Sequence, residues 1–267
     1  MSMKLEELVA VIEEIAPSKL QEKWDNNGIQ IAAGSEDINR ILVSLEINDE
    51  VIEEAKMDDV DMIITHHPLI FGKLSSVDYR QIPGKYIAKL ISLGISVYSS
   101  HTPFDKAEGG NNDYLTELIG LKDTSSLSYP DGELESIGRI GQFIVPYTLE
   151  QTILLAQERL DLEPEQITAV GNLDTSIKTV AVCTGAGADF IDVARQNGCE
   201  LLITGDLKYH EAQKAKEIDL CVIDAGHYGT EKFFGENMAM KLIHKLEGQI
   251  EVITSVVDLD PFLSIVK

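Results

Sequence analysis

Short apolar runs alternate with amphipathic segments along the chain. Leu5, Leu8 and Ile12 recur at helical spacing near the N-terminus, and Pro17 ends the helix that they predict. The runs RILVSLEI, VDMIITHH and ISVYSS are short and continuous, as is typical of buried strands, and helix-like segments separate them. The same alternation resumes after residue 135. Strands that alternate with helices predict crossover connections, a largely parallel sheet and an α/β fold.

Capping residues and polar segments indicate where these elements begin and end. Asn48 and Thr148 stand where N-caps of two predicted helices are expected, and a long helix is expected from about Gly229. Residues 122–135, KDTSSLSYPDGELE, are polar and rich in Ser, Asp and Gly. This composition predicts a boundary between two parts of the chain.

Three of the predicted strands are followed by residue types that bind metal ions. In open α/β sheets, ligands bind at the carboxyl ends of the strands, so we expect these separate segments to converge on one edge. Imidazole and carboxylate ligands together suit zinc, iron or manganese better than magnesium or calcium, and two-metal hydrolytic sites use this mixture. The residues are His66 and His67, then His101 and Asp105, and finally His227 and Glu231, which have the i, i+4 spacing of one helix face.

Three weaker features are candidates for substrate binding. Gly185 and Gly187, in TGAGADF, could cradle phosphate oxygens at a helix N-terminus, or they could serve a tight turn. Phe190 stands where a dinucleotide-binding fingerprint would have its third glycine. Asp206 could face the same cleft or cap the helix that follows it, and His210 could contact substrate or lie on the surface.

The charge balance and the cysteines exclude several classes of protein. With 22 Lys and Arg against 45 Asp and Glu, the net charge of −23 disfavours binding to nucleic acids and to anionic membranes. The three cysteines form no C-x-x-C pair and lie in or beside apolar runs, which predicts buried thiols in a reducing compartment. The acidic residues that interrupt the first apolar segment argue against a signal peptide, so we expect a cytoplasmic protein.

Five segments, in order along nearly the whole chain, resemble the Nif-three-like family, whose bacterial members carry the name GTP cyclohydrolase I type 2. The resemblance implies a two-lobed α/β subunit, each lobe a mostly parallel or mixed sheet flanked by helices, with a metal site between the lobes. It implies a first lobe of residues 1–125 plus 226–267 and an inserted second lobe of residues 126–225. The segments are WDNNGIQ (24–30), THHPLIF (65–71), SSHTPFD (99–105), TGDLKYHEA (204–212) and DAGHYGTE (224–231).

The resemblance also implies two divalent metal ions per subunit, a toroidal homohexamer and a small-molecule substrate of the nucleotide kind. The implied reaction is opening of a purine ring by metal-bound hydroxide, with His101 outside the ligand set as a positioning residue or proton shuttle. The alternative is a non-catalytic metal-binding ring that docks protein partners. The implied metal ligands are His66, His67, Asp105, His227 and Glu231.

Overall fold

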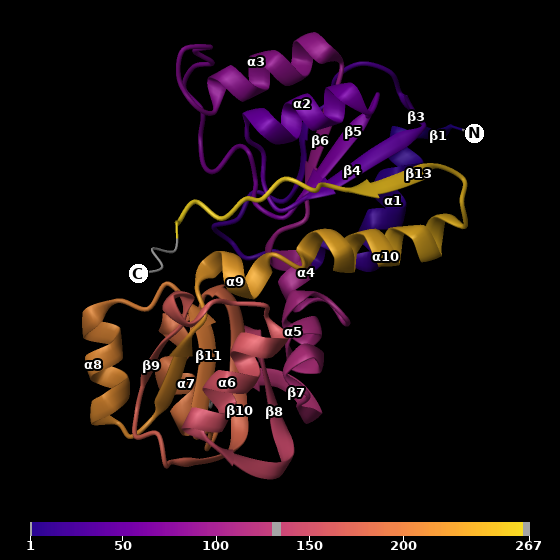
Figure 1. Ribbon diagram of the computed structural model, residues 1–267. Helices are drawn as coiled ribbons and strands as arrows, with labels where there is room; N and C mark the ends of the chain where they lie inside the picture. Colours follow the sequence, from indigo (N-terminus) through magenta and orange to yellow (C-terminus); the bar gives the residue numbers. More distant parts are fainter. Residues whose placement is uncertain (1, 130–134, 264–267) are drawn as a thin grey trace. The chain divides into compact units, whose positions relative to one another are not determined.

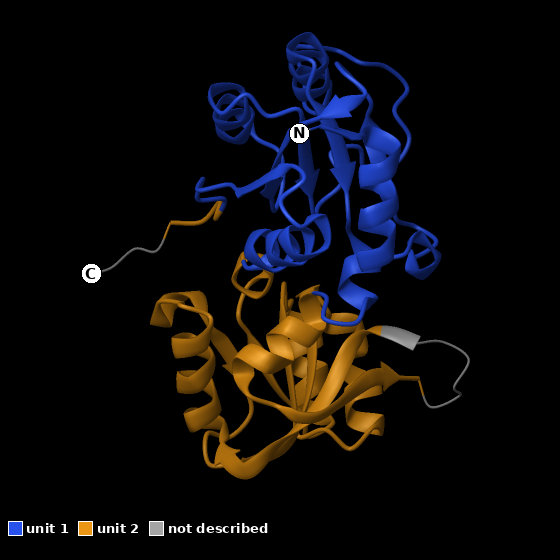
Figure 2. Cartoon of the chain, turned by 90° about the vertical axis from the view of Figure 1, so that its right-hand side faces the viewer, with its two compact units in different colours: residues 1–110, 233–259 blue, residues 111–232, 260–267 orange. Residues whose placement is uncertain are grey.

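The computed structural model describes residues 2–129 and 135–263, which form two compact units (Figure 2). Unit 1 comprises Met1–Gly110 and Phe233–Leu259, and unit 2 comprises Asn111–Lys232 and Asp260–Lys267. The chain therefore leaves unit 1, builds most of unit 2, and returns. These units are groups of residues in mutual contact. The division into two lobes, residues 1–125 with 226–267 and residues 126–225, remains a prediction.

Unit 1 is built on a five-stranded sheet. Its first four strands run parallel, and the last is antiparallel to its neighbour. A separate antiparallel pair joins β1 (Met3–Lys4) to β3 (Asp37–Ile38). The order across the sheet is β13 (Glu251–Thr254), β4 (Arg40–Ser44), β5 (Met62–Thr65), β6 (Ser96–Ser99) and β2 (Gly28–Ile31).

Helices cover both faces of this sheet, with α2 and α3 on one face and α1 and α10 on the other (Figure 1). All the residues of β5 and β6 are buried, which explains why these strands are continuous apolar runs in the sequence. The helical segments are α1 (Leu5–Ile15), η1 (Ser18–Leu20), α2 (Asp49–Met57), α3 (Gly84–Leu93), α4 (Thr102–Lys106) and α10 (Phe234–Leu246).

Unit 2 is built on a six-stranded mixed sheet. Its strands β10, β11 and β12 are parallel, β8 and β9 pair antiparallel with them on either side, and β7 pairs antiparallel with β8. The order across the sheet is β7 (Lys122–Ser128), β8 (Glu135–Thr148), β10 (Ser176–Ala186), β11 (Leu201–Gly205), β12 (Cys221–Asp224) and β9 (Thr168–Val170).

The core of unit 2 lies between this sheet and its helices. Ala181, Leu202 and Val222 come from the three parallel strands and form one buried cluster with Ile191 of α7 and Ala215 of α8. The helical segments are α5 (Asn111–Ile119), α6 (Leu149–Arg159), η2 (Pro164–Gln166), η3 (Ala188–Phe190), α7 (Ile191–Gln196), α8 (Tyr209–Glu217) and α9 (His227–Glu231).

The structure confirms the α/β fold with two helix-flanked sheets, and both predicted N-caps. Asn48 accepts a hydrogen bond from the backbone of Val51, and Thr148 accepts one from the backbone of Gln151. Within the described residues, no helix combines the length and the apolar character that crossing a membrane requires.

The structure adds detail to the sequence-based expectations at three places. The polar residues 122–128 form β7 rather than a connecting loop, because an edge strand pairs on one side only and tolerates exposed polar side chains; residues 130–134 of the expected boundary lie outside the described residues. Of the two roles left open for Asp206, capping of α8 does not occur, because Lys208 occupies the N-cap position. The helix expected from about Gly229 is two helices, α9 and α10, with a break after Glu231.

We predict that Asn48→Ala lowers the free energy of unfolding of unit 1 by about 1 kcal/mol, because the backbone N–H of Val51 loses its acceptor at 2.8 Å. Urea unfolding followed by amide hydrogen exchange of α2 measures the change. Asn48→Asp keeps an acceptor oxygen and should stay close to the wild type. An equal loss in both variants would contradict the capping role.

Candidate metal centre

In unit 1, strand register brings candidate ligands to one edge of the sheet. Ser44 pairs with Thr65, and Thr65 pairs with Ser99, so the parallel strands β4, β5 and β6 end level with one another. The residues that follow these strands therefore emerge side by side. They include Glu46 after β4, His66 and His67 after β5, and Ser100 and His101 after β6.

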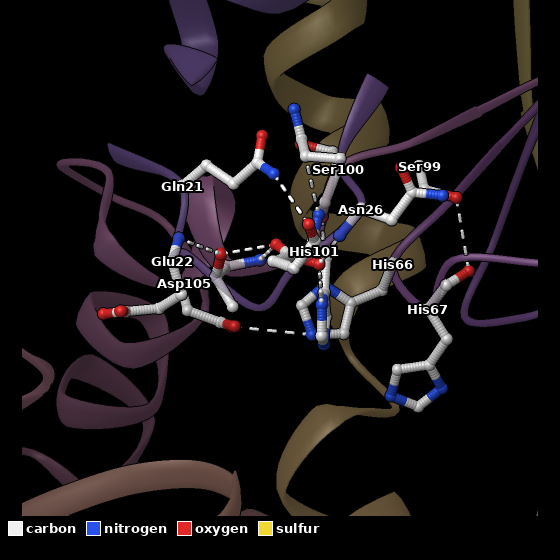
Figure 3. A network of polar contacts seen from close by, with 12 residues as sticks. Gln21, Glu22, Asn26, His66, His67, Ser99, Ser100, His101 and Asp105 are labelled. Atoms are coloured by element: carbon white, nitrogen blue, oxygen red, sulfur yellow. Dashed lines mark hydrogen bonds and ion pairs between the residues drawn. The ribbon is translucent and has the colours of Figure 1, made fainter. Parts of the chain in front are cut away.

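The two ring nitrogens of the buried His66 have different partners, and the nitrogen that carries the lone pair faces a carboxylate. Its Nδ1 lies 3.1 Å from the carbonyl oxygen of Ser100, which can only accept, so Nδ1 carries the proton. Its Nε2 lies 3.5 Å from Oδ1 of Asp105 on α4, which is also buried (Figure 3). In the neutral ring these are two acceptors facing each other, an arrangement that a divalent cation stabilises.

His67 and His101 are oriented in the same way. Nδ1 of His67 lies 3.4 Å from Oε2 of Glu46, and Nδ1 of His101 lies 2.7 Å from Oδ1 of Asp25. Histidines that bind metals characteristically donate their other ring N–H to a carboxylate or a backbone carbonyl. Ligand nitrogens of the three histidines, His66, His67 and His101, lie within 4.8 Å of one another, which is close enough to hold a metal ion.

Asp25 is a buried carboxylate that stays charged beside His101. Burial alone would raise its pKa, but hydrogen bonds from His101 and Thr102 outweigh burial and lower the pKa of this carboxyl. Oδ2 of Asp25 also accepts the backbone N–H of Thr102 at 3.1 Å. Asp25 therefore fixes both the ring of His101 and the start of α4, the helix that carries Asp105.

Unit 2 carries a second group of candidate ligands, at the carboxyl ends of its own parallel strands. Asp206 follows β11, and His227 and Glu231 share one face of α9. Nδ1 of His227 lies 2.8 Å from Oδ2 of Asp206, and its Nε2 lies 3.1 Å from Oε2 of Glu231. A neutral imidazole can donate to only one of these carboxylates, so a cation bound by Nε2 and Glu231 would satisfy both contacts.

The contacts of Gly185 and Gly187 favour the tight-turn interpretation. Their backbone N–H groups donate to the hydroxyls of Thr230 and Thr204, each at 2.9 Å. Gly185 has a φ of +63°, and a Cβ there would lie 2.3 Å from Oε1 of Glu231. Glycine at this position therefore lets the turn pack against a candidate ligand, and phosphate binding by these residues stays a prediction.

The remaining candidates lie apart from these contacts. His210 is exposed on α8, with its ring centroid 5.2 Å from that of Tyr209, so contact with substrate stays a prediction. Cys183, Cys199 and Cys221 are buried, as expected. Burial raises the pKa of Cys199 to about 12 and also raises the pKa of Cys221, so neither provides a thiolate nucleophile at neutral pH.

Sequence reasoning assigned no role to Asp25 or Glu46. Glu46 lies two residues after β4, as His101 lies two residues after β6, so the rule that identified His66 and His101 near strand ends would also have identified Glu46. Asp25 follows no strand and lies 76 residues from His101 in the sequence. Its only signal was its place in the segment WDNNGIQ.

An open cavity of about 480 Å³ in unit 2 adjoins this second group of candidate ligands. Asp206 and His227 line it, and Leu162 and Phe262 contribute apolar surface. Its charged lining consists of carboxylates, with no Lys or Arg among the described residues that form its wall. The carboxylates are Glu165, Asp206, Asp224 and Asp260.

Comparisons with known proteins give a consistent result. The chain matches the family model described as Duf34/NIF3 (NGG1p interacting factor 3) over residues 3–261. It is 34% identical over 261 residues to a Clostridium perfringens protein named GTP cyclohydrolase 1 type 2 homolog, covering 97% of this chain and 99% of the relative. A Helicobacter pylori protein named GTP cyclohydrolase 1 type 2 is 33% identical over 232 residues, with 86% and 88% covered.

The fold is also shared with solved structures. A Bacillus cereus protein described as related to NIF3 matches with a TM-score of 0.91 at 23% identity, covering 99% of both chains. A Staphylococcus aureus protein matches with a TM-score of 0.89 at 27% identity, covering 98% of this chain and 99% of that one.

We predict that a thiol reagent at neutral pH labels none of the three cysteines in the native protein and all three after denaturation. Each thiol is buried, and burial holds the pKa of Cys199 and of Cys221 above the usual value. Colorimetric thiol titration gives both counts. Rapid labelling of native protein would reveal an accessible thiol and reopen the possibility of a cysteine nucleophile.

Proposed function

Because the chain belongs to the Duf34/NIF3 family, we propose that it is a metal-dependent hydrolase that opens a purine-type heterocycle, as the names of its relatives suggest. One observation supports this proposal above the others. In both units, a histidine with Nδ1 held by an acceptor directs Nε2 toward a carboxylate. This donor arrangement is typical of metal-binding histidines.

In this proposal the protein binds two divalent cations, which are zinc, iron or manganese, as nitrogen and carboxylate ligands favour. When bound, such a cation polarises the substrate and lowers the pKa of a coordinated water. The proposed ligands are His66, His67, Asp105, His227 and Glu231.

We assign proton transfer to His101, supported by Asp25. The short contact between Nδ1 of His101 and the carboxylate of Asp25 favours the tautomer with its lone pair on Nε2. Nε2 can then accept a proton from the attacking water and return it to the ring nitrogen as the first C–N bond breaks, which opens the ring to a formamide. A second water, deprotonated in the same way, would cleave the remaining C–N bond and release formate. The ring of His101 is partly accessible, with 14% of its side chain exposed, so a substrate can reach it.

The charge of the cavity beside His227 bears on the choice of substrate. Four carboxylates and no Lys or Arg line it within the described residues, which disfavours a bare triphosphate there. We therefore propose that the heterocycle, more than the phosphate chain, is what the protein recognises. Guanosine should be compared with GTP, together with a panel of uncharged cyclic amides.

The assembly and the location of the protein stay predictions. We propose a homohexamer in the cytoplasm, as the family resemblance implies, and light scattering of the purified protein would measure the mass of the assembly. A non-catalytic ring that docks protein partners is the alternative, and absence of turnover in a metal-loaded hexamer would favour it.

We predict that zinc- or manganese-loaded protein releases formate from GTP or guanosine, and that His67→Ala abolishes the release because one ligand nitrogen is lost. Formate is assayed enzymatically, and metal content by elemental analysis. His244→Ala, which removes an exposed histidine of α10, is the matched control and should keep both metal and activity. Release that is equal in His67→Ala and the wild type would refute the hydrolase proposal.

We predict that Asp206→Ala weakens metal binding by about 10- to 100-fold, because Nδ1 of His227 loses the carboxylate 2.8 Å away. Competition with a chromophoric chelator measures the affinity. Asp206→Asn keeps an acceptor oxygen and should retain more of the affinity than Asp206→Ala. An unchanged metal affinity in Asp206→Ala would contradict the proposal that this carboxylate orients the ring of His227.

A further inference from the structure

Two large aromatic side chains stand exposed beside the histidines of unit 1. The side chain of Trp24 is 58% exposed and that of Phe71 is 67% exposed. Their ring centroids lie 6.2 Å apart with the ring planes tilted by 52°, and the ring of Trp24 lies 5.8 Å from that of His101, edge-on to it. Large aromatic residues usually bury their rings, so an exposed pair next to candidate ligands calls for an explanation.

Hydrogen bonds fix the backbone beside both members of this pair. Asp25, the neighbour of Trp24, binds Nδ1 of His101. Asn26 donates from Nδ2 to the carbonyl oxygen of Ile70 at 2.7 Å, so the segment that carries Trp24 is tied to the residue before Phe71. The polar network fixes the backbone on both sides, while the two rings stay in contact with solvent.

Gln30 completes this network. Its Oε1 accepts the backbone N–H of Ile70 at 3.2 Å, and its Nε2 donates to the carbonyl oxygen of Asn26 at 2.8 Å. The segment WDNNGIQ therefore links three stretches of unit 1: its own loop, the loop that carries Phe71, and the segment at His101. This gives a role to a sequence motif that the candidate ligands alone leave unexplained.

We propose that Trp24 and Phe71 form an aromatic platform in which the planar heteroaromatic ring of the substrate stacks on one ring and packs against the other, tilted ring, with one edge toward His101. Every such ring has a π-face, so aromatic side chains bind it by stacking with little need of charged groups. The proposal rests on the proposed function for the reaction and specifies the class of substrate.

An interface with a second copy of the chain is the competing explanation. Exposed apolar residues continue along the same part of unit 1 at Leu74, Val77 and Ile82. Two observations favour the platform over an interface. The ring of Trp24 contacts the ring of His101, and hydrogen bonds fix the backbone beside Trp24 and Phe71. An interface that only buries apolar side chains needs neither. The experiment below distinguishes the two explanations.

Trp24 is the only tryptophan of the chain, so intrinsic fluorescence reports directly on this platform. We expect guanosine to quench the emission saturably, in both metal-free and zinc-loaded protein. Ribose and inorganic tripolyphosphate, which have no aromatic ring, should leave the emission unchanged. Phe71→Ala should weaken guanosine binding by about 10- to 100-fold, since one stacking surface is lost.

Tyr79→Ala is the matched control, because it removes another exposed aromatic residue of unit 1, which is 72% exposed. It should bind guanosine as the wild type does. Trp24→Phe, measured by calorimetry, should keep binding better than Trp24→Ala. Absence of quenching by guanosine, or equal affinity in Phe71→Ala and the wild type, would overturn the platform. So would an emission maximum that shifts with protein concentration and not with guanosine.

Failure of this proposal can be told apart from failure of the proposed function. Quenching by guanosine without formate release would support the platform and contradict the proposed hydrolase activity. Formate release with an unchanged KM in Phe71→Ala would contradict the platform and support the proposed hydrolase activity.

Discussion

Hydrogen bonds at Nδ1 of four histidines determine what the rest of this structure can do. His66 binds a backbone carbonyl, and His67, His101 and His227 face the carboxylates of Glu46, Asp25 and Asp206. Each contact favours the tautomer that carries its lone pair on Nε2 and fixes the direction in which that lone pair points. Without these acceptors the rings could rotate, and Nε2 of His66 and of His227 would no longer be held toward Asp105 and Glu231.

The fold provides these acceptors through strand register. Parallel strands that end level deliver consecutive loops to one edge, and this happens once in each unit. In unit 1 the edge brings Glu46, His67 and His101 together, and in unit 2 it brings Asp206 close to His227. Glycine at position 185 serves the same end, because any side chain there would collide with Glu231.

The strands and the candidate ligands were predictable because both depend on local sequence. Continuous apolar runs indicated β4, β5 and β6, and ligand-type residues within a few positions of the strand ends indicated His66, His101 and His227. The polar edge strand β7 was not predictable from hydrophobicity, since its stability comes from pairing with β8. The contact of Asp25 with His101 was not predictable either, because it depends on tertiary packing between distant segments.

The central claim is that these histidines bind metal through Nε2. A crystal structure of zinc-loaded protein, with anomalous scattering collected at the zinc edge, tests it most directly. The account predicts anomalous peaks at about 2.0–2.1 Å from Nε2 of His66, His67 and His227. Coordination through Nδ1, or anomalous peaks remote from these rings, would contradict it.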